Sequence, residues 1–194
     1  YQDKCEYCDL LITGSGPSGL ASAYAAAKNG ARVILAEDKP RFGGSLLTSD
    51  VNIGNQTGVE WTEKIIAELK SMPNVTVKNR SQVFGYYDHN MLVMSERISD
   101  HLPKTQKYLP KQRLWYIRAN EVLISSGSIE RPLVFGNNDT PGVMLSSAAK
   151  EYMKVYGVLV GKKPLIFTNN DSGYETAIEF KKNGVNPIIL DTRS

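Results

Sequence analysis

The sequence predicts an α/β fold built around a Rossmann-like FAD/NAD(P)-binding domain. Three observations lead to this prediction. A glycine-rich loop separates a short apolar run from an alanine-rich segment, a later stretch takes on the two-residue period of strands, and a further apolar run, helical pattern and apolar run come last. We therefore expect a parallel sheet, an antiparallel β-meander and the start of a second βαβ domain.

The first βαβ unit is expected within residues 9–36. Residues 9–13 (DLLIT) form a short apolar run stopped by glycine, which is typical of a parallel strand buried on both faces. A helix is expected from about 17 to 29, because proline stands near its first turn and glycine follows its end. Residues 32–36 (RVILA) then form the second strand.

A second helix and the meander come next. Residues 57–60 (TGVE) have the spacing of a capping box, and apolar residues recur after it at helical intervals. After a short strand at 75–77, the pattern predicts a β-meander at about 83–118, laid over the parallel sheet. Its strands are expected at 83–87, 91–98 and 114–118, and the exposed loop between the last two at 99–111.

A buried strand and a second βαβ pattern complete the prediction. Residues 121–126 (EVLISS) return to a buried strand, and a helix is expected at 146–156. Strand, helix and strand patterns then occur at 163–168, 172–183 and 186–190. We place the first part of the dinucleotide-binding domain at 1–157 and the start of a second, degenerate nucleotide-binding-like domain at 158–194.

The loop between the first strand and the first helix has a G-x-G-x-x-G pattern. A pyrophosphate needs close backbone approach and positive polarity, and a glycine-rich turn that leads into a helix N-terminus supplies both. The pattern is informative here because it follows a strand, opens a helix and precedes a second strand that leads into an acid. The expected pyrophosphate-binding residues are Gly14, Ser15, Gly16, Pro17, Ser18 and Gly19.

The acid after the second strand is Glu37, which follows Gly19 by 18 residues. A carboxylate at this position accepts hydrogen bonds from the adenosine ribose hydroxyls and repels a 2′-phosphate, so NAD or FAD is favoured over NADP. Asp38 and Lys39 would lie beside the adenosine. The alternative interpretation is that Glu37 and Asp38 only begin a solvated loop.

A second glycine turn follows the acid. Gly43 and Gly44 allow another stretch of backbone to close on the dinucleotide, and Arg41 is either a phosphate partner or a solvated side chain. The strand that ends at Ser126 and Gly127 resembles the Ala-Thr-Gly strand of flavoproteins with two nucleotide-binding domains. In those proteins this strand returns the chain to the cofactor.

The loop of the second βαβ pattern differs from the first. Residues 168–173 (TNNDSG) keep a single glycine, and Asp171 would bring a negative charge close to a phosphate. We therefore do not expect a second dinucleotide there. A structural domain or a partner surface is the expected role of this unit.

Composition excludes several classes of function. The formal net charge of +3 comes from scattered basic residues, so we expect no nucleic-acid partner. No apolar run approaches the roughly 20 residues that span a bilayer, and no secretory leader pattern is visible, so we expect no membrane partner and a cytoplasmic location.

Candidate catalytic and metal-binding residues are scarce. Cys5 and Cys8 form a C-x-x-C pair, but no second pair or histidine cluster completes a site, so we expect two reduced thiols and no metal. His89 and His101 both lie in expected loops. No set of side chains suggests a nucleophile or a general base, and the catalytic residues stay unassigned.

Several longer strings carry a resemblance to a specific family. They are residues 45–47 (SLL), 84–88 (FGYYD), 112–115 (QRLW), 127–135 (GSIERPLVF) and 137–144 (NNDTPGVM). With these strings the sequence resembles the alpha subunit of heterotetrameric sarcosine oxidase, over almost its whole length.

The resemblance implies an enzyme that oxidatively demethylates sarcosine to glycine, makes H2O2 from O2 and passes the one-carbon unit to tetrahydrofolate. It implies NAD in this chain, FMN at the alpha–beta interface and FAD on the beta subunit, with gamma and delta subunits as further partners. It also implies that Ser18 lines the helix start, Ser45 bonds a phosphate or ribose, and Val83 lies against the adenine. Small size at Ser18 and ordinary core packing at Val83 are the alternatives.

Other interpretations stay open. One is a related amine-oxidising subunit, such as that of an opine or proline dehydrogenase, with FAD in the same pocket, and another is a non-catalytic structural subunit. Residues 85–88 are either a meander turn or a subunit contact. Because alpha subunits of the family are several times longer, we expect this chain to be a fragment without oxidase activity that holds its dinucleotide weakly.

Overall fold

A computed structural model of the chain describes residues 2–103 and 108–193. The chain divides into two compact units, Tyr1–Gly127 (unit 1) and Ser128–Ser194 (unit 2). The domain boundary that we expected between residues 157 and 158 would lie inside unit 2, and it stays a prediction. Among the described residues, no helix is long and apolar enough to cross a lipid bilayer.

Unit 1 is built on one mixed sheet of six strands in the order β5-β2-β1-β8-β7-β6. Four neighbours are parallel: β5 (Val75–Lys78), β2 (Val33–Ala36), β1 (Gln2–Thr13) and β8 (Gln112–Ile124). The sheet continues antiparallel through β7 (Met91–Arg97) to β6 (Ser81–Tyr87). The expected α/β fold with its parallel sheet and antiparallel meander is confirmed.

The connection between the two halves of this sheet differs from the prediction. We expected separate strands at 114–118 and 121–126, but β8 is continuous from Gln112 to Ile124 and pairs with β7 on one edge and β1 on the other. The polar residues near Asn120 interrupt the apolar pattern and so indicated a break between two strands. Asn120 instead accepts a hydrogen bond from the Tyr7 hydroxyl (2.6 Å) within the sheet.

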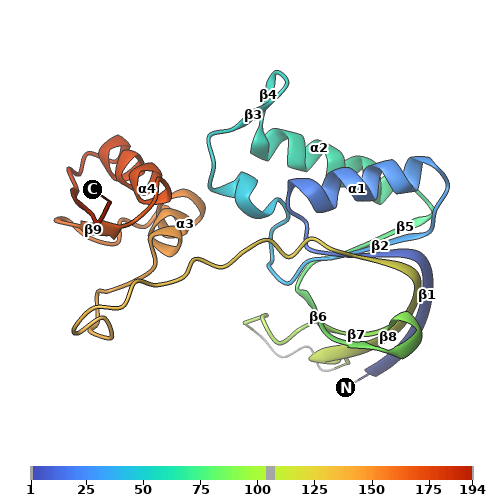
Figure 1. Cartoon of the computed structure of the whole chain (residues 1–194). Helices are drawn as coiled ribbons and strands as arrows, with labels where there is room; N and C mark the ends of the chain where they lie inside the picture. Colours follow the sequence, from blue (N-terminus) through green and yellow to red (C-terminus); the bar gives the residue numbers. More distant parts are fainter. Residues whose placement is uncertain (1, 104–107, 194) are drawn as a thin grey trace. The chain divides into compact units, whose positions relative to one another are not determined.

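The two halves of the sheet enclose an apolar core. Figure 1 shows β1 and β8 running together and bending, so that the meander strands fold back to face the parallel half. Side chains from both halves meet there, among them Leu11 and Ile34 from the parallel strands and Met94, Trp115 and Ile117 from the meander strands. The meander therefore covers the parallel strands, as expected, while remaining part of the same sheet.

Two helices cover the opposite face of the parallel half (Figure 1). They are α1 (Pro17–Lys28) and α2 (Gly58–Ser71), and both pack on a core that includes Ile12, Leu35 and Leu69. Thr57 and Glu60 form the predicted capping box at the start of α2. Short elements complete unit 1: β3 (Asn52–Ile53), β4 (Gln56–Thr57) and the 3-10 turns η1 (Gly44–Leu47) and η2 (Asp88–Asn90).

Unit 2 has a smaller core. Unit 2 contains α3 (Ser146–Tyr156), β9 (Leu165–Thr168), α4 (Ser172–Lys182) and β10 (Ile188–Asp191). β9 and β10 pair in parallel, as the second βαβ pattern predicted. Met153 of α3 packs with Phe180 of α4 and Ile166 of β9, which places the expected 146–156 helix in the core of unit 2.

Candidate dinucleotide site

The loop between β1 and α1 is compressed against the end of β8. Gly14 has a φ of +99°, and a Cβ there would lie 2.3 Å from the main-chain oxygen of Ser125. A Cβ on Gly19 would lie 2.0 Å from the main-chain oxygen of Gly14. Because neither distance leaves room for a carbon atom, the backbone of unit 1 itself requires glycine at both positions.

Gly16 is different, because no described atom lies within 4 Å of where its Cβ would be. Its φ of −67° is open to any residue. Gly16 is the N-cap of α1, no side chain of the described residues caps this helix, and its first turn has no acid. No described side chain therefore satisfies the first N–H groups of α1, and an uncapped helix N-terminus has the polarity that an anion needs. Pro17 and Ser18 lie exposed on that first turn.

Glu37 lies directly after β2, as predicted, but it is only 6% exposed. Its Oε2 accepts hydrogen bonds from the Ser15 main-chain N–H (2.9 Å) and the Ser15 hydroxyl (2.5 Å). Its Oε1 accepts one from the main-chain N–H of Lys39 (2.9 Å). The Glu37 carboxylate is thus buried and organises the loop around it, whereas Asp38 and Lys39, which follow it, are exposed.

The second glycine turn closes on the same loop. The N–H of Gly43 donates to the main-chain oxygen of Ser15 (3.0 Å) and to its hydroxyl (3.2 Å). A Cβ on Gly44 would lie 2.9 Å from the Cα of Gly16. The loop, the acid and the turn therefore form one connected structure. Ser45, at the start of η1, and Arg41 are both exposed.

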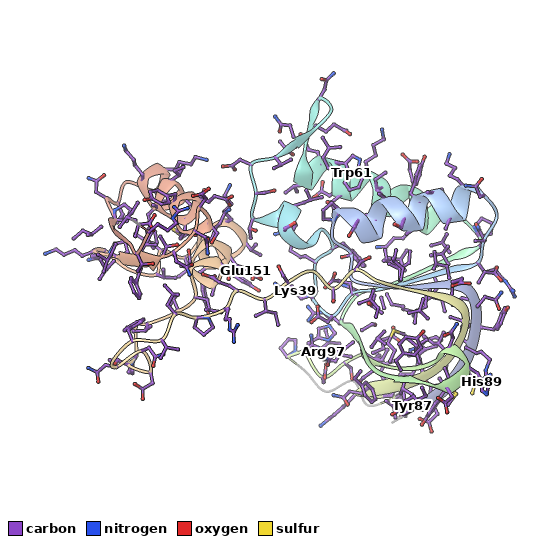
Figure 2. The ribbon with its side chains drawn as sticks, in the orientation of Figure 1. Lys39, Trp61, Tyr87, His89, Arg97 and Glu151 are labelled. Carbon is purple, nitrogen blue, oxygen red and sulfur yellow. The ribbon has the colours of Figure 1, made fainter. Side chains whose placement is uncertain are left out.

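A polar cavity of about 330 Å³ lies beside Asp38. It is lined by Asp38, Arg80, Gln82, Ser95, Arg97 and Gln112. The guanidinium of Arg97 donates to the main-chain oxygen of Asp38 (3.3 Å), and the N–H of Arg80 donates to the main-chain oxygen of Lys39 (3.1 Å). Figure 2 shows Lys39 and Arg97 in unit 1.

Sequence reasoning missed Arg80 and Arg97 because chain folding alone brings them to Asp38. Arg97 ends β7, 59 positions along the chain from Asp38, and no motif connects the two. Arg80 has a φ of +52°, an uncommon conformation for a residue other than glycine, in a segment without glycine or proline. Neither residue had a local signal that could have marked it.

Three expected site residues, Val83, Ser126 and Gly127, form no hydrogen bond with the glycine loop within the described part of the chain. Val83 packs, half-buried, against the core between the two halves of the sheet. Ser126 and Gly127 are exposed just beyond β8, and the N–H nitrogen of Ser126 lies 3.2 Å from where a Cβ on Gly14 would be. Ser126 therefore borders the glycine loop, whereas Val83 lies in the core.

Among the described residues, the cysteines and histidines do not gather into a metal site. Cys5 is exposed and Cys8 is buried, and burial raises the pKa of the Cys8 thiol to about 11. Tyr87 and His89 lie at the opposite end of the meander from Arg97 (Figure 2). Within residues 2–103 and 108–193, no three His, Cys, Asp or Glu side chains gather as a metal site would require.

The corresponding loop of unit 2 is occupied by a side chain of its own. The guanidinium of Arg193 donates to Asp171 (2.8 Å) and to Asp191 (2.8 Å). These bonds hold the pKa of the Asp191 carboxyl well below its usual range. The hydroxyl of Tyr174 also donates to Asp191 (3.0 Å).

The sequence profile of a family described as FAD dependent oxidoreductase matches residues 9–71, which include the loop, Glu37 and the second glycine turn. Over 194 residues, the chain is 44% identical to the sarcosine oxidase subunit alpha of Rhizobium meliloti (strain 1021), covering 100% of this chain and 20% of that protein. The chain is a relative of sarcosine oxidase alpha subunits.

Further similarities agree with this relationship. The sarcosine oxidase subunit alpha of Corynebacterium sp. (strain P-1) is 37% identical over 190 residues, which cover 97% of this chain and 20% of that protein. The crystal structure of L-proline dehydrogenase from P. horikoshii superposes with a TM-score of 0.79 at 22% identity, covering 98% of this chain and 37% of that one. The chain therefore has an oxidoreductase fold and spans about a fifth of the length of these curated relatives.

Proposed function

We propose that unit 1 binds NAD, with the pyrophosphate over Gly16 and the adenosine ribose at Glu37. The observation that carries this proposal is the empty space at Gly16. Gly14 and Gly19 are glycine because neighbouring backbone leaves no room, but no described protein atom explains Gly16. A ligand that must approach the main chain closely would explain it, because a Cβ would hold the pyrophosphate away from the N–H groups.

The rest of the site supports an adenine dinucleotide. The uncapped first turn of α1 would stabilise the negative pyrophosphate, and Glu37 keeps acceptor capacity for a ribose hydroxyl. We place the adenosine beside Asp38 and Lys39, next to the polar cavity with Arg80 and Arg97. Bound NAD would supply a nicotinamide that accepts a hydride, and we assign no residue of this chain to that end.

For the whole protein we propose the activity that the names of its relatives state, that of a sarcosine oxidase. It would oxidatively demethylate sarcosine to glycine, with O2 reduced to H2O2 and the one-carbon unit passed to tetrahydrofolate. This chain would be the NAD-binding part of an alpha subunit that assembles with beta, gamma and delta subunits. FMN would lie at the alpha–beta interface and FAD on the beta subunit. The support for this proposal is the 44% identity to a sarcosine oxidase subunit alpha.

A second candidate is FAD in the same pocket, as part of an amine, opine or proline dehydrogenase. The observation that favours it is the match of residues 9–71 to the FAD dependent oxidoreductase family. The pyrophosphate loop and the acid would serve either dinucleotide, because both carry an ADP half. Colour separates the two, since a purified protein with bound FAD absorbs visible light and one with bound NAD does not.

Substitution of Gly16 tests the site directly. We expect Gly16→Ala in the full-length protein to lower the affinity for NAD by roughly tenfold or more, about 1.4 kcal/mol, because the added methyl group occupies the pyrophosphate position. The ordinary φ of Gly16 and the open space around it predict only a small loss of thermal stability, which comes from the weaker preference of alanine for an N-cap. Isothermal titration calorimetry with NAD and with FAD measures the affinity.

Gly161→Ala is the matched control. Gly161 also has no described atom within 4 Å of its Cβ position, and its φ lies outside the left-handed region. It should leave the affinity for either dinucleotide unchanged. If the wild-type protein bound neither NAD nor FAD, unit 1 would be a structural module and the proposed function would be wrong.

A further inference from the structure

Ser15 is the one polar side chain of the glycine loop that is fully buried. It is 0% exposed, and its hydroxyl has two partners inside the protein. The hydroxyl donates to Glu37 Oε2 (2.5 Å) and accepts from the N–H of Gly43 (3.2 Å). The main chain of Ser15 repeats both contacts, since its N–H donates to Glu37 Oε2 (2.9 Å) and its oxygen accepts from Gly43 (3.0 Å).

This arrangement restricts what Glu37 can still do. An ionised carboxylate has about four lone-pair positions for hydrogen-bond donors. Ser15 takes two of them on Oε2 and the N–H of Lys39 takes one on Oε1. One position, on Oε1, is left for a ligand, so the carboxylate can receive one ribose hydroxyl and not both.

We propose that Ser15 is a positioning residue that aims Oε1 of Glu37 at a single hydroxyl of the adenosine ribose, without touching the dinucleotide itself. This inference rests on the proposed function, in which Glu37 binds that ribose. It changes the role expected for Ser15, which the glycine pattern placed among the residues that contact the pyrophosphate. A buried hydroxyl with partners on both sides is not free to reach a ligand.

The chemistry of the ligand follows from this geometry. One acceptor position distinguishes the 2′ and 3′ hydroxyls of the ribose, because only one of them can donate to Oε1. The dinucleotide recognised here should therefore lose affinity when one of these hydroxyls is removed and much less when the other is removed. Without the Ser15 hydroxyl, Oε2 regains a lone pair, the carboxylate can turn, and this distinction should weaken.

A double-mutant cycle tests the role of Ser15. Ser15→Ala, Glu37→Gln and the double variant are made in the full-length protein and titrated calorimetrically with NAD. We expect Ser15→Ala to lower the affinity for NAD by roughly fivefold, the size expected for one hydrogen bond, and to have no further effect in the Glu37→Gln background. Equal losses in both backgrounds, or wild-type affinity for Ser15→Ala, would overturn the proposal.

The ribose analogues supply a measurement that a merely structural role would not change. NAD with 2′-deoxyadenosine and NAD with 3′-deoxyadenosine should differ in affinity for the wild type by several-fold, and this ratio should move toward one in Ser15→Ala. Equal affinities of the wild type for the two analogues would contradict a single acceptor position. If the protein binds FAD and not NAD, the same cycle is measured with FAD.

Ser99→Ala is the matched control for the loss of a buried serine. Ser99 is 7% exposed, and its hydroxyl donates to the main-chain oxygen of Pro110 (3.0 Å), remote from the loop in sequence. It should leave the affinity for NAD unchanged. If Ser15→Ala does not fold, Ser15→Cys keeps a side chain of similar size with a weaker donor and should show the same coupling to Glu37. A wild type that binds no dinucleotide would overturn the proposed function, and the role of Ser15 with it.

Discussion

The two βαβ units of this chain, β1-α1-β2 and β9-α4-β10, share their frame and differ in what occupies the loop. Glu37 directly follows Ala36, the last paired residue of β2, and Asp191 is the last paired residue of β10, so both acids lie at the carboxyl end of the second strand. Each acid accepts the N–H of the residue two positions on, Lys39 and Arg193 respectively. The two units therefore share the strand–helix–strand arrangement and also this local hydrogen bond.

The two units differ in the other hydrogen-bond partners of Glu37 and Asp191. Glu37 is held by the main chain and hydroxyl of Ser15, which leaves the end of α1 open. Asp191 is held by the guanidinium of Arg193, which also bonds Asp171 in the loop, and Asn170 accepts the N–H of Ser172 at the start of α4. A βαβ frame with a helix N-terminus can therefore accept an anion only where the protein leaves that end unsatisfied.

One glycine position is common to both loops, and its substitution gives the largest predicted effect on stability. A Cβ on Gly19 would meet the main-chain oxygen of Gly14 at 2.0 Å, whereas one on Gly173 would meet the side chain of Thr168 at 2.7 Å. We expect Gly19→Ala to destabilise unit 1 by about 3 kcal/mol or more, and Gly173→Ala to cost unit 2 less, because a side chain moves more easily than backbone. Hydrogen exchange resolved by unit measures both, and equal losses would contradict the comparison.

A smaller effect is expected from the arginine that occupies the second loop. Its bonds lower the pKa of the Asp191 carboxyl, so they stabilise unit 2 at a pH above the ordinary aspartate value of about 3.9 and are lost as the pH falls through the lowered pKa. In Arg193→Ala the pKa of the Asp191 carboxyl should rise toward its ordinary value, while the main-chain N–H of residue 193 and the Tyr174 hydroxyl still lower it. Nuclear magnetic resonance titration of that carboxyl checks this expectation, and an unchanged pKa would show that Arg193 is not its main partner.

The smallest effect concerns the independence of the two units. Cys8 lies in the core of unit 1, and its raised pKa of about 11 leaves roughly one thiol in a thousand ionised at pH 8. A thiol reagent should therefore modify the exposed Cys5 quickly and Cys8 only when unit 1 opens. NAD should slow the modification of Cys8, and Arg193→Ala should leave its rate unchanged. Mass spectrometry follows both thiols, and rapid labelling of Cys8 in the native protein would contradict the burial.

Local patterns in the sequence predicted the features that depend on neighbouring residues. The capping box at Thr57 and Glu60 and the acid after β2 are both where the spacing placed them. The reason for Gly14 was not visible, because its neighbour Ser125 comes from a strand more than a hundred residues later. The continuity of β8 was hidden as well, since the polar residues around Asn120 find partners only on β1 and near the meander turn.

The inner organisation of the site was beyond sequence reasoning for a similar reason. A serine between two glycines has the composition of a loop that faces a ligand, and only the burial of Ser15 shows that it faces Glu37. Arg97, at the end of β7, reaches the backbone of Asp38 although β1 and β8 lie between β7 and β2 in the strand order, because the meander half of the sheet folds back over the parallel half. Residue types predicted which groups belong to the loop, whereas the partners of those groups depended on tertiary contacts.

The long pairing of β1 with β8 also has a consequence for how the protein is made. Gln2 pairs with Arg113 and Thr13 with Ile124, so during synthesis β1 must wait for more than a hundred further residues before this edge is covered. Contacts between such distant segments slow folding and leave an unpaired strand open to wrong partners. Synthesis of residues 112–124 is thus the step that closes unit 1, and until then the glycine loop lacks the neighbour that compresses it.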